Sequence, residues 1–209
     1  MHNFSSRLLL ITATALGFTL SSIARGQPGA PAVPVVPENL RVPSGNIPWL
    51  KAFAAGTQNY VCLPGVDGPA WKFVGPQATL FVTYPWFQGE ARQQIATHYL
   101  SVNPAEGDTA RPTWQHSLDT SAVWAKPVAN STDPAFVAPG AIPWLLLEVV
   151  GTQRGPMGGA GLLPTTYIQR LKTSGGVAPA GGCDASTYGA FAMVPYTTDY
   201  LFYMADTRN

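Results

Sequence analysis

Residues 77–84 read QATLFVTY, and this stretch carries a clear secondary-structure signal. Its residues alternate between two sets, Leu80, Val82 and Tyr84 on one side and Thr79, Phe81 and Thr83 on the other. A period of two places successive side chains on opposite faces of an extended chain, and these residue types are enriched in sheets. The stretch therefore predicts a β-strand.

Other segments share this apolar, β-branched and aromatic character, at 57–62, 70–75, 93–100, 121–128, 142–150, 165–173 and 191–205. Residues 165–173 could form a short helix, but their composition favours a strand. Prolines interrupt almost every interval, so a helix longer than about three turns has little room. Strands spaced about ten residues apart predict one mainly-β domain, a sandwich or a barrel.

The composition narrows the class of protein. Of 209 residues, 46% are hydrophobic and only 11% charged, with 21 glycines and 20 prolines. Such a charge-poor, turn-rich chain is neither a coiled coil, nor a helical bundle, nor a charged disordered tail. The formal net charge of +1 excludes a strongly basic nucleic-acid binder, because neutralising phosphates requires clustered Lys and Arg. We expect no nucleic-acid partner.

Residues 1–26 have the pattern of a secretory signal peptide. Arg7 precedes an apolar run at residues 8–20, and small residues at Ala24 and Gly26 form a cleavage pattern. The run is shorter than the roughly 20 residues that a membrane-spanning helix needs. We therefore expect an exported protein, extracellular or periplasmic, with no transmembrane segment in the mature chain.

Residues 27–43 contain prolines at positions 28, 31, 34, 37 and 43. This density favours an extended polyproline conformation and excludes helix. We interpret the segment as an arm lying over the domain, with a proline-rich ligand for a partner as the alternative. No clean linker divides residues 44–209, which are expected to form a single mainly-β domain.

Cys62 and Cys183 are the only cysteines. Export would place them where disulfides persist, so a bridge between them is favoured over a metal pair or reactive thiols. Zinc sites prefer closely spaced ligands such as C-x-x-C, which are missing from the sequence. A bridge closing a loop of about 120 residues would contribute roughly 4–5 kcal/mol in the chain-entropy model.

No motif indicates a cofactor. The sequence contains no G-x-S-x-G, H-E-x-x-H or P-loop pattern. Residues 155–163, GPMGGAGLL, lack the G-x-G-x-x-G spacing, and Pro164 blocks the helix that a dinucleotide site requires. His98 and His116 are the only histidines after the leader, and their separation of 18 positions does not support a metal site. We expect neither a metal nor a cofactor.

Three residues are candidates for ligand binding: His98, Trp114 and Arg170. His98 is expected either to make a structural hydrogen bond or to serve as a ligand or catalytic group. Trp114 is one of six tryptophans, which would form an aromatic platform for a ligand or fill the core. In a strand, Arg170 would share a face with Ile168 and Lys172 and be aimed at an anion, or form a salt bridge.

Several blocks in order carry a family resemblance: AGTQNYVC, PAW, QATL, THY, RPTW, IPWLLLEVVG, TTYIQRLKTSGGVAPAGGC and VPYTTDYLFY. Over residues 38–204 they resemble the exported family known as domain of unknown function 3455. Members are sometimes labelled malate dehydrogenase, but this sequence lacks the strand–turn–helix of a dinucleotide fold. The family usually follows its His-aromatic pair closely with Pro-x-Trp. Here LSVNPAEGDTAR separates the two, which predicts an inserted loop.

Three functions are compatible with these observations. The favoured one is a secreted, non-catalytic module that binds a small molecule, a glycan or a surface partner. The alternatives are an enzyme of unassigned class using His98 and Arg170, and a structural envelope or extracellular protein. An enzyme should gather both residues and a carboxylate in one cleft, whereas a binder should have an aromatic-lined pocket without that constellation.

Overall fold

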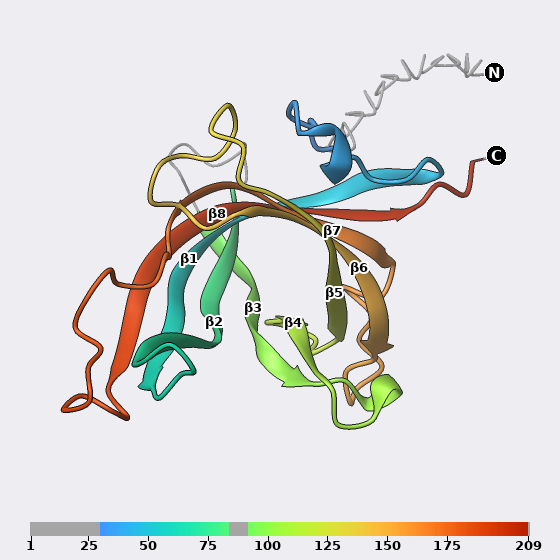
Figure 1. Ribbon diagram of the computed structural model, residues 1–209. Coiled ribbons are helices and arrows are strands. Elements are labelled where there is room, and N and C mark those ends of the chain that lie inside the picture. The colour runs from blue at the N-terminus through green and yellow to red at the C-terminus, as the bar shows by residue number, and fades with distance from the viewer. Residues whose placement is uncertain (1–29, 84–91, 209) are drawn as a thin grey trace, which may run out of the picture.

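The computed structural model describes residues 30–83 and 92–208, which form a closed barrel of antiparallel strands in sequence order (Figure 1). The strands are β1 (Asn46–Leu63), β2 (Ala70–Thr83), β3 (Arg92–Val102), β4 (Ala110–His116), β5 (Ala122–Ser131), β6 (Trp144–Gln153), β7 (Thr165–Gly175) and β8 (Phe191–Ala205). Two short 3-10 helices complete it, η1 (Glu38–Leu40) and η2 (Pro104–Glu106). The predicted mainly-β fold is confirmed, and the barrel is the architecture formed. The predicted signal peptide lies outside the described residues.

The barrel closes through β1 and β8, whose pairing runs from Asn46 opposite Ala205 to Val61 opposite Phe191. These two strands come from opposite ends of the described chain and lie side by side in Figure 1. Closure leaves no strand with an unpaired edge among the eight. No helix in the described ranges is long and apolar enough to span a membrane.

The strands differ from the predicted ones in length and in two assignments, although both sets number eight. The segments 70–75 and 77–84, expected as two strands, belong mainly to the single strand β2, and β4 was not predicted as a strand. Five prolines lie inside strands, Pro48, Pro76, Pro112, Pro127 and Pro195, and of these Pro76 was expected to lie between two strands. The pairing register shifts beside two of them, between Pro48 and Leu50 and between Pro127 and Ala129. Such irregularities let a ladder accommodate a residue without an N–H donor.

The barrel interior combines small and large side chains. Alanines on β1, β2, β3 and β5 face large aromatic groups on β4 and β8, among them Trp114, Tyr200 and Phe202. An eight-stranded barrel is just wide enough either to be filled by side chains or to hold one small ligand. Whether this barrel is filled or has room for a ligand depends on how completely side chains occupy each of its two ends.

One end of the barrel is filled by the plug loop, which we define as residues 154–164 between β6 and β7. Its Leu162 is fully buried in the interior core. Asp119, in the β4–β5 turn, holds this loop by accepting a hydrogen bond from Gly161 N–H at 2.7 Å. A side chain at Gly155 or Gly159 would collide with Asp119, so these glycines permit the close approach of two backbones. The glycine-rich segment therefore closes the barrel.

Residues 30–43 of the proline-rich arm pack on the outside of the barrel (Figure 1). Leu40 is fully buried in a second apolar cluster with Trp144, Leu146 and Leu171, which point outward from β6 and β7. The Leu40 carbonyl accepts a 2.6 Å hydrogen bond from the buried Gln169 amide. Both faces of this part of the sheet are thus buried.

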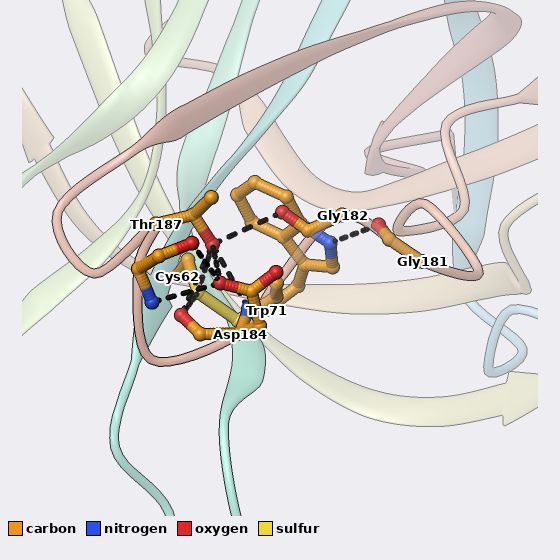
Figure 2. Close-up of a disulfide and its surroundings, with 8 residues drawn as sticks. Cys62, Trp71, Gly181, Gly182, Asp184 and Thr187 are labelled. Atoms are coloured by element: carbon orange, nitrogen blue, oxygen red, sulfur yellow. Dashed lines mark hydrogen bonds between the residues drawn. A yellow bond between two sulfur atoms is a disulfide. The ribbon is translucent and has the colours of Figure 1, made fainter.

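At the other end of the barrel, the strap (residues 176–190) is fastened to β1 by a disulfide. Cys62 and Cys183 form the predicted bridge, with their Cα atoms 5.4 Å apart. Figure 2 shows the Trp71 indole beside it, with Nε1–H donating to the Gly181 carbonyl at 2.9 Å. The pairing of Cys62 with the backbone of Gly189 and Ala190 adds two hydrogen bonds of 2.9 Å each.

Candidate functional site

A pocket of about 270 Å³ lies inside the barrel at the end opposite the plug loop. Its walls come from all eight strands and from the residues just before β6. The apolar part of the lining is Phe73, Pro76, Leu100, Pro112, Pro127, Ile142, Pro143, Leu145 and Leu147. The volume is close to the lower limit of about 300 Å³ for typical small-molecule sites.

Another hollow, of about 520 Å³, lies over β1, β2 and β3. It is more open than the interior pocket, and its lining contains no Asp, Glu, Lys or Arg. Enclosure and convergent polar groups, rather than volume, distinguish a specific binding site. We therefore regard the interior pocket as the candidate site.

His98 and Trp114 form one wall of the interior pocket. They are opposite each other on β3 and β4, and their rings stack with centroids 4.2 Å apart. His98 Nδ1 lies 2.9 Å from the Thr113 carbonyl, to which it donates because a carbonyl oxygen can only accept. Burial, assisted by the nearby Arg170 charge, lowers the pKa of His98 to about 3, although the hydrogen bond with the Thr113 carbonyl opposes this shift. The imidazole is therefore neutral at pH 7, with Nε2 as an acceptor.

Arg170 brings the positive charge to the pocket. It is half-buried on β7, and its Nε and Nη2 atoms donate to the Pro143 carbonyl at 3.2 and 2.8 Å. Within the described ranges no carboxylate lies within ion-pair distance of its guanidinium. Arg170 therefore does not form the salt bridge that the sequence left as an alternative role for it.

Tyr200 brings a hydroxyl that lacks a hydrogen-bond partner. The side chain is 1% exposed, and its ring packs against those of His98 and Trp114 with centroids 5.4 Å away in each case. Burial raises the pKa of Tyr200 well above its usual value. Arg170 and Tyr196 lie near enough to influence that pKa, yet neither completes a hydrogen bond of regular geometry with the hydroxyl.

Two further buried polar groups near Tyr200 also lack a regular hydrogen bond. The Tyr196 hydroxyl and the Gln58 amide nitrogen complete no hydrogen bond of regular geometry, although both side chains are at least 97% buried. Tyr200 and Gln58 lie near enough to Tyr196 to lower its pKa against the larger effect of burial. Unpaired buried polar groups are uncommon in folded proteins, because each costs about 1–3 kcal/mol. With Arg170 these groups form a polar region in this end of the barrel.

The structure thus brings the three sequence-predicted candidates, His98, Trp114 and Arg170, to one pocket from β3, β4 and β7. The expected inserted loop does not separate the first two, because residues 100–111 extend the β3–β4 hairpin beyond them. Their roles as ligand contacts stay predictions.

One detail of the Arg170 prediction is wrong. Ile168 lies in the interior core and Arg170 on the pocket, but Lys172 does not share their face. The β7–β8 register shifts between Leu171 and Ser174, and Lys172 has a φ of 52°. Its amine lies on the outer surface, 3.9 Å from Asp199. A bulge of this kind breaks the period of two on which the prediction depended.

Sequence reasoning did not identify Tyr200, Gln58 or Leu145 as part of the site. Tyr196 and Tyr200 are four residues apart and therefore share a face of β8, which is a detectable signal. The pattern could not show that this face is the interior, because Leu201 and Tyr203 on the opposite face are also buried.

A second cluster of polar groups lies at the plug loop. His116 Nδ1 is 3.0 Å from Asp119 Oδ1, which accepts hydrogen bonds from the Ser121 backbone and hydroxyl at 2.9 and 2.7 Å. The Ser121 hydroxyl also accepts from Leu162 N–H at 3.1 Å. These groups are satisfied by one another and by the loop, which gives them a structural role. Residues 30–83 and 92–208 contain no group of three His, Cys, Asp or Glu side chains placed to hold a metal.

Comparison with known proteins yields one family. The model of a family described as "Protein of unknown function (DUF3455)" matches residues 43–204, close to the range of the resemblance noted in the sequence. Searches among curated proteins and among solved structures gave no match.

Proposed function

The chain belongs to the DUF3455 family of proteins of unknown function, and we propose that it is an exported protein that binds a small molecule inside its barrel. The observation that carries the proposal is the interior pocket itself. It has apolar walls and converging polar groups, some of them buried without partners. This combination is typical of small-molecule sites.

The arrangement of the barrel supports this proposal. The plug loop fills one end with Leu162, whereas proline, leucine and aromatic side chains leave space at the other. The disulfide and the hydrogen bond from the Tyr60 hydroxyl to the Gly176 carbonyl, 2.7 Å, fasten the strap at this end. A disulfide is compatible with an oxidising compartment, as expected for an exported protein. A pre-formed pocket reduces the ordering cost of binding.

The protonation of His98 favours binding over acid–base catalysis. A general base works best with a pKa near the operating pH, and the pKa of His98 is lowered to about 3. The lining described for this pocket also contains no Asp or Glu that could orient the imidazole. Proton transfer through His98 and Arg170 therefore has less support than a binding role.

The proposal is tested by filling the pocket. N-phenyl-1-naphthylamine is an uncharged probe whose fluorescence rises in apolar surroundings, and we expect it to bind the parent protein. Leu145 lines the pocket and packs against the core, so Leu145→Trp should occupy the space and weaken probe binding by about tenfold or more. The measurement is a fluorescence titration at pH 7.

Val66→Trp is the matched control, because Val66 is fully exposed in the β1–β2 turn. It adds the same indole without entering the barrel and should leave the affinity unchanged. Thermal melting of both variants establishes that they are folded. A parent that does not bind the probe, or a folded Leu145→Trp variant that binds it as the parent does, would contradict the proposal.

A further inference from the structure

The charge of the interior pocket is unbalanced. Arg170 lines it, and none of the other described residues of the lining is an Asp, Glu, Lys or Arg. The Arg170 charge lowers the pKa of Tyr60, His98, Tyr196 and Tyr200 against the larger effect of burial on the tyrosines. A half-buried cation surrounded by neutral groups favours a negatively charged partner.

The unpaired groups of the pocket are hydrogen-bond donors. The Tyr200 hydroxyl and the Gln58 amide nitrogen complete no hydrogen bond of regular geometry, although Tyr196 lies near both, and both side chains line the pocket. The Arg170 guanidinium is itself donor-only, and the described bonds use only its Nε and Nη2 groups. Because donors predominate, the complementary atoms of a ligand are acceptors such as carboxylate oxygens.

The rest of the pocket sets the size and character of the ligand. Its walls are leucine, isoleucine, proline and aromatic side chains, and its volume is about 270 Å³. Such walls suit an apolar body, whereas a ligand with several charges would leave most of them unpaired in a dry site. With His98 neutral at pH 7, Arg170 has no cationic neighbour in the lining to help neutralise a dianion.

From this arrangement we infer that the pocket selects a small organic monoanion, a carboxylate on an apolar body, with the carboxylate at Arg170 and Tyr200. The inference rests on the proposed function and adds the chemical class of the ligand. A neutral molecule of the same shape would leave the guanidinium without a counter-charge. A cationic one would face repulsion from it.

The test compares shape-matched acids and amides. Benzoate and benzamide differ in charge but little in shape, and hexanoate and hexanamide form the equivalent pair with an aliphatic body. Isothermal titration calorimetry at pH 7 should give at least one acid an affinity about tenfold or more above that of its amide, as expected for a charge-assisted hydrogen-bonded pair. In Arg170→Gln the preference should fall below about threefold.

Two variants refine the measurement. Tyr200→Phe removes only the hydroxyl and should reduce the preference in part, which covers the case that Arg170→Gln fails to fold. Arg208→Gln is the matched control, because Arg208 is exposed at the end of the chain and pairs with Asp206. It should keep the full preference.

Each other outcome overturns the inference. Amides that bind as tightly as the acids would show that the pocket does not select an anion. An acid preference that survives in folded Arg170→Gln would locate the anion elsewhere. If neither pair binds although N-phenyl-1-naphthylamine does, the anionic class is wrong and the proposed function stands. If the naphthylamine also fails, both are wrong.

Discussion

His98 illustrates how one buried side chain can serve both the fold and the pocket. It is 3% exposed, and its Nδ1–H satisfies the Thr113 carbonyl, so it acts as a structural histidine. The same ring stacks on Trp114 and lines the pocket. From the sequence, a structural hydrogen bond and a ligand contact were alternative roles for His98. The structure shows the hydrogen bond and places the same ring in the pocket wall, where contact with a ligand stays a prediction.

Stability should depend on pH through His98. Its pKa is about 3 in the folded chain against about 6.5 when unfolded, so between these values the unfolded chain binds a proton that the folded chain does not. The contribution of the neutral ring is complete above pH 6.5 and is lost progressively toward pH 3. Between pH 6.5 and 4.5 the parent should lose about 1–3 kcal/mol more unfolding free energy than His98→Gln.

Urea unfolding of both proteins at a series of pH values measures this difference. Glutamine has an amide that can still donate to the Thr113 carbonyl, but the variant loses the titration and the ring stacking on Trp114. The loss of stacking lowers stability equally at every pH, so the pH dependence reports the titration. His98→Ala removes the donor and should cost about 1–3 kcal/mol at pH 7. Parallel stability curves for the parent and His98→Gln would show that His98 does not titrate in this way.

At the scale of single elements, the plug loop determines which end of the barrel is open. Asp119 connects the β4–β5 turn to this loop through Gly161 and, by way of Ser121, to Leu162. Burial raises the pKa of Asp119, but the donors from Ser121 and Gly161 outweigh it and hold the pKa at about 2. This carboxylate is therefore ionised at pH 7, and its contribution to stability is complete above about pH 4 and is lost as the pH falls through about 2.

Asp119→Ala should lower the unfolding free energy by about 2–4 kcal/mol, because it leaves backbone donors of the loop unpaired. Asp108→Ala is the comparison, since Asp108 is an exposed carboxylate in the β3–β4 turn and should change stability by less than about 0.5 kcal/mol. Denaturant unfolding provides the two values. Equal stability of the two variants would mean that Asp119 does not hold the loop.

The observed strands show which of the segments predicted from the sequence pattern were correct. The alternating segment at 191–205 matches β8 residue for residue, and 93–100 and 165–173 lie within β3 and β7. Pattern reasoning failed at Pro76 and at a bulge in β7. Pro76 lies inside β2 rather than between two strands, and the bulge at Lys172 reverses its direction. A proline marks a missing donor in the sequence, but only the neighbouring strand decides whether that donor is needed.

For the whole molecule, the sequence predicted the all-β class and the Cys62–Cys183 bridge, which joins positions 121 residues apart. It could not distinguish a barrel from a sandwich, because both produce alternating strands at similar spacing. The distinction depends on β1 pairing with β8, a contact between distant segments. The candidate site has the same origin, since Arg170 reaches His98 and Trp114 only through closure of the barrel.

Binding in the interior pocket is tested most directly by locating the residues that a bound molecule contacts. In a protein with isotope-labelled leucine methyl groups, titration with N-phenyl-1-naphthylamine can be followed by NMR at each leucine. If the probe binds in the interior pocket, the methyl signals of Leu100, Leu145 and Leu147, which line the pocket, should shift together and saturate. Those of Leu40 and Leu171 under the arm and of the exposed Leu118 should stay in place. Shifts confined to the arm cluster or to the surface, with the three pocket leucines unaffected, would contradict an interior binding site.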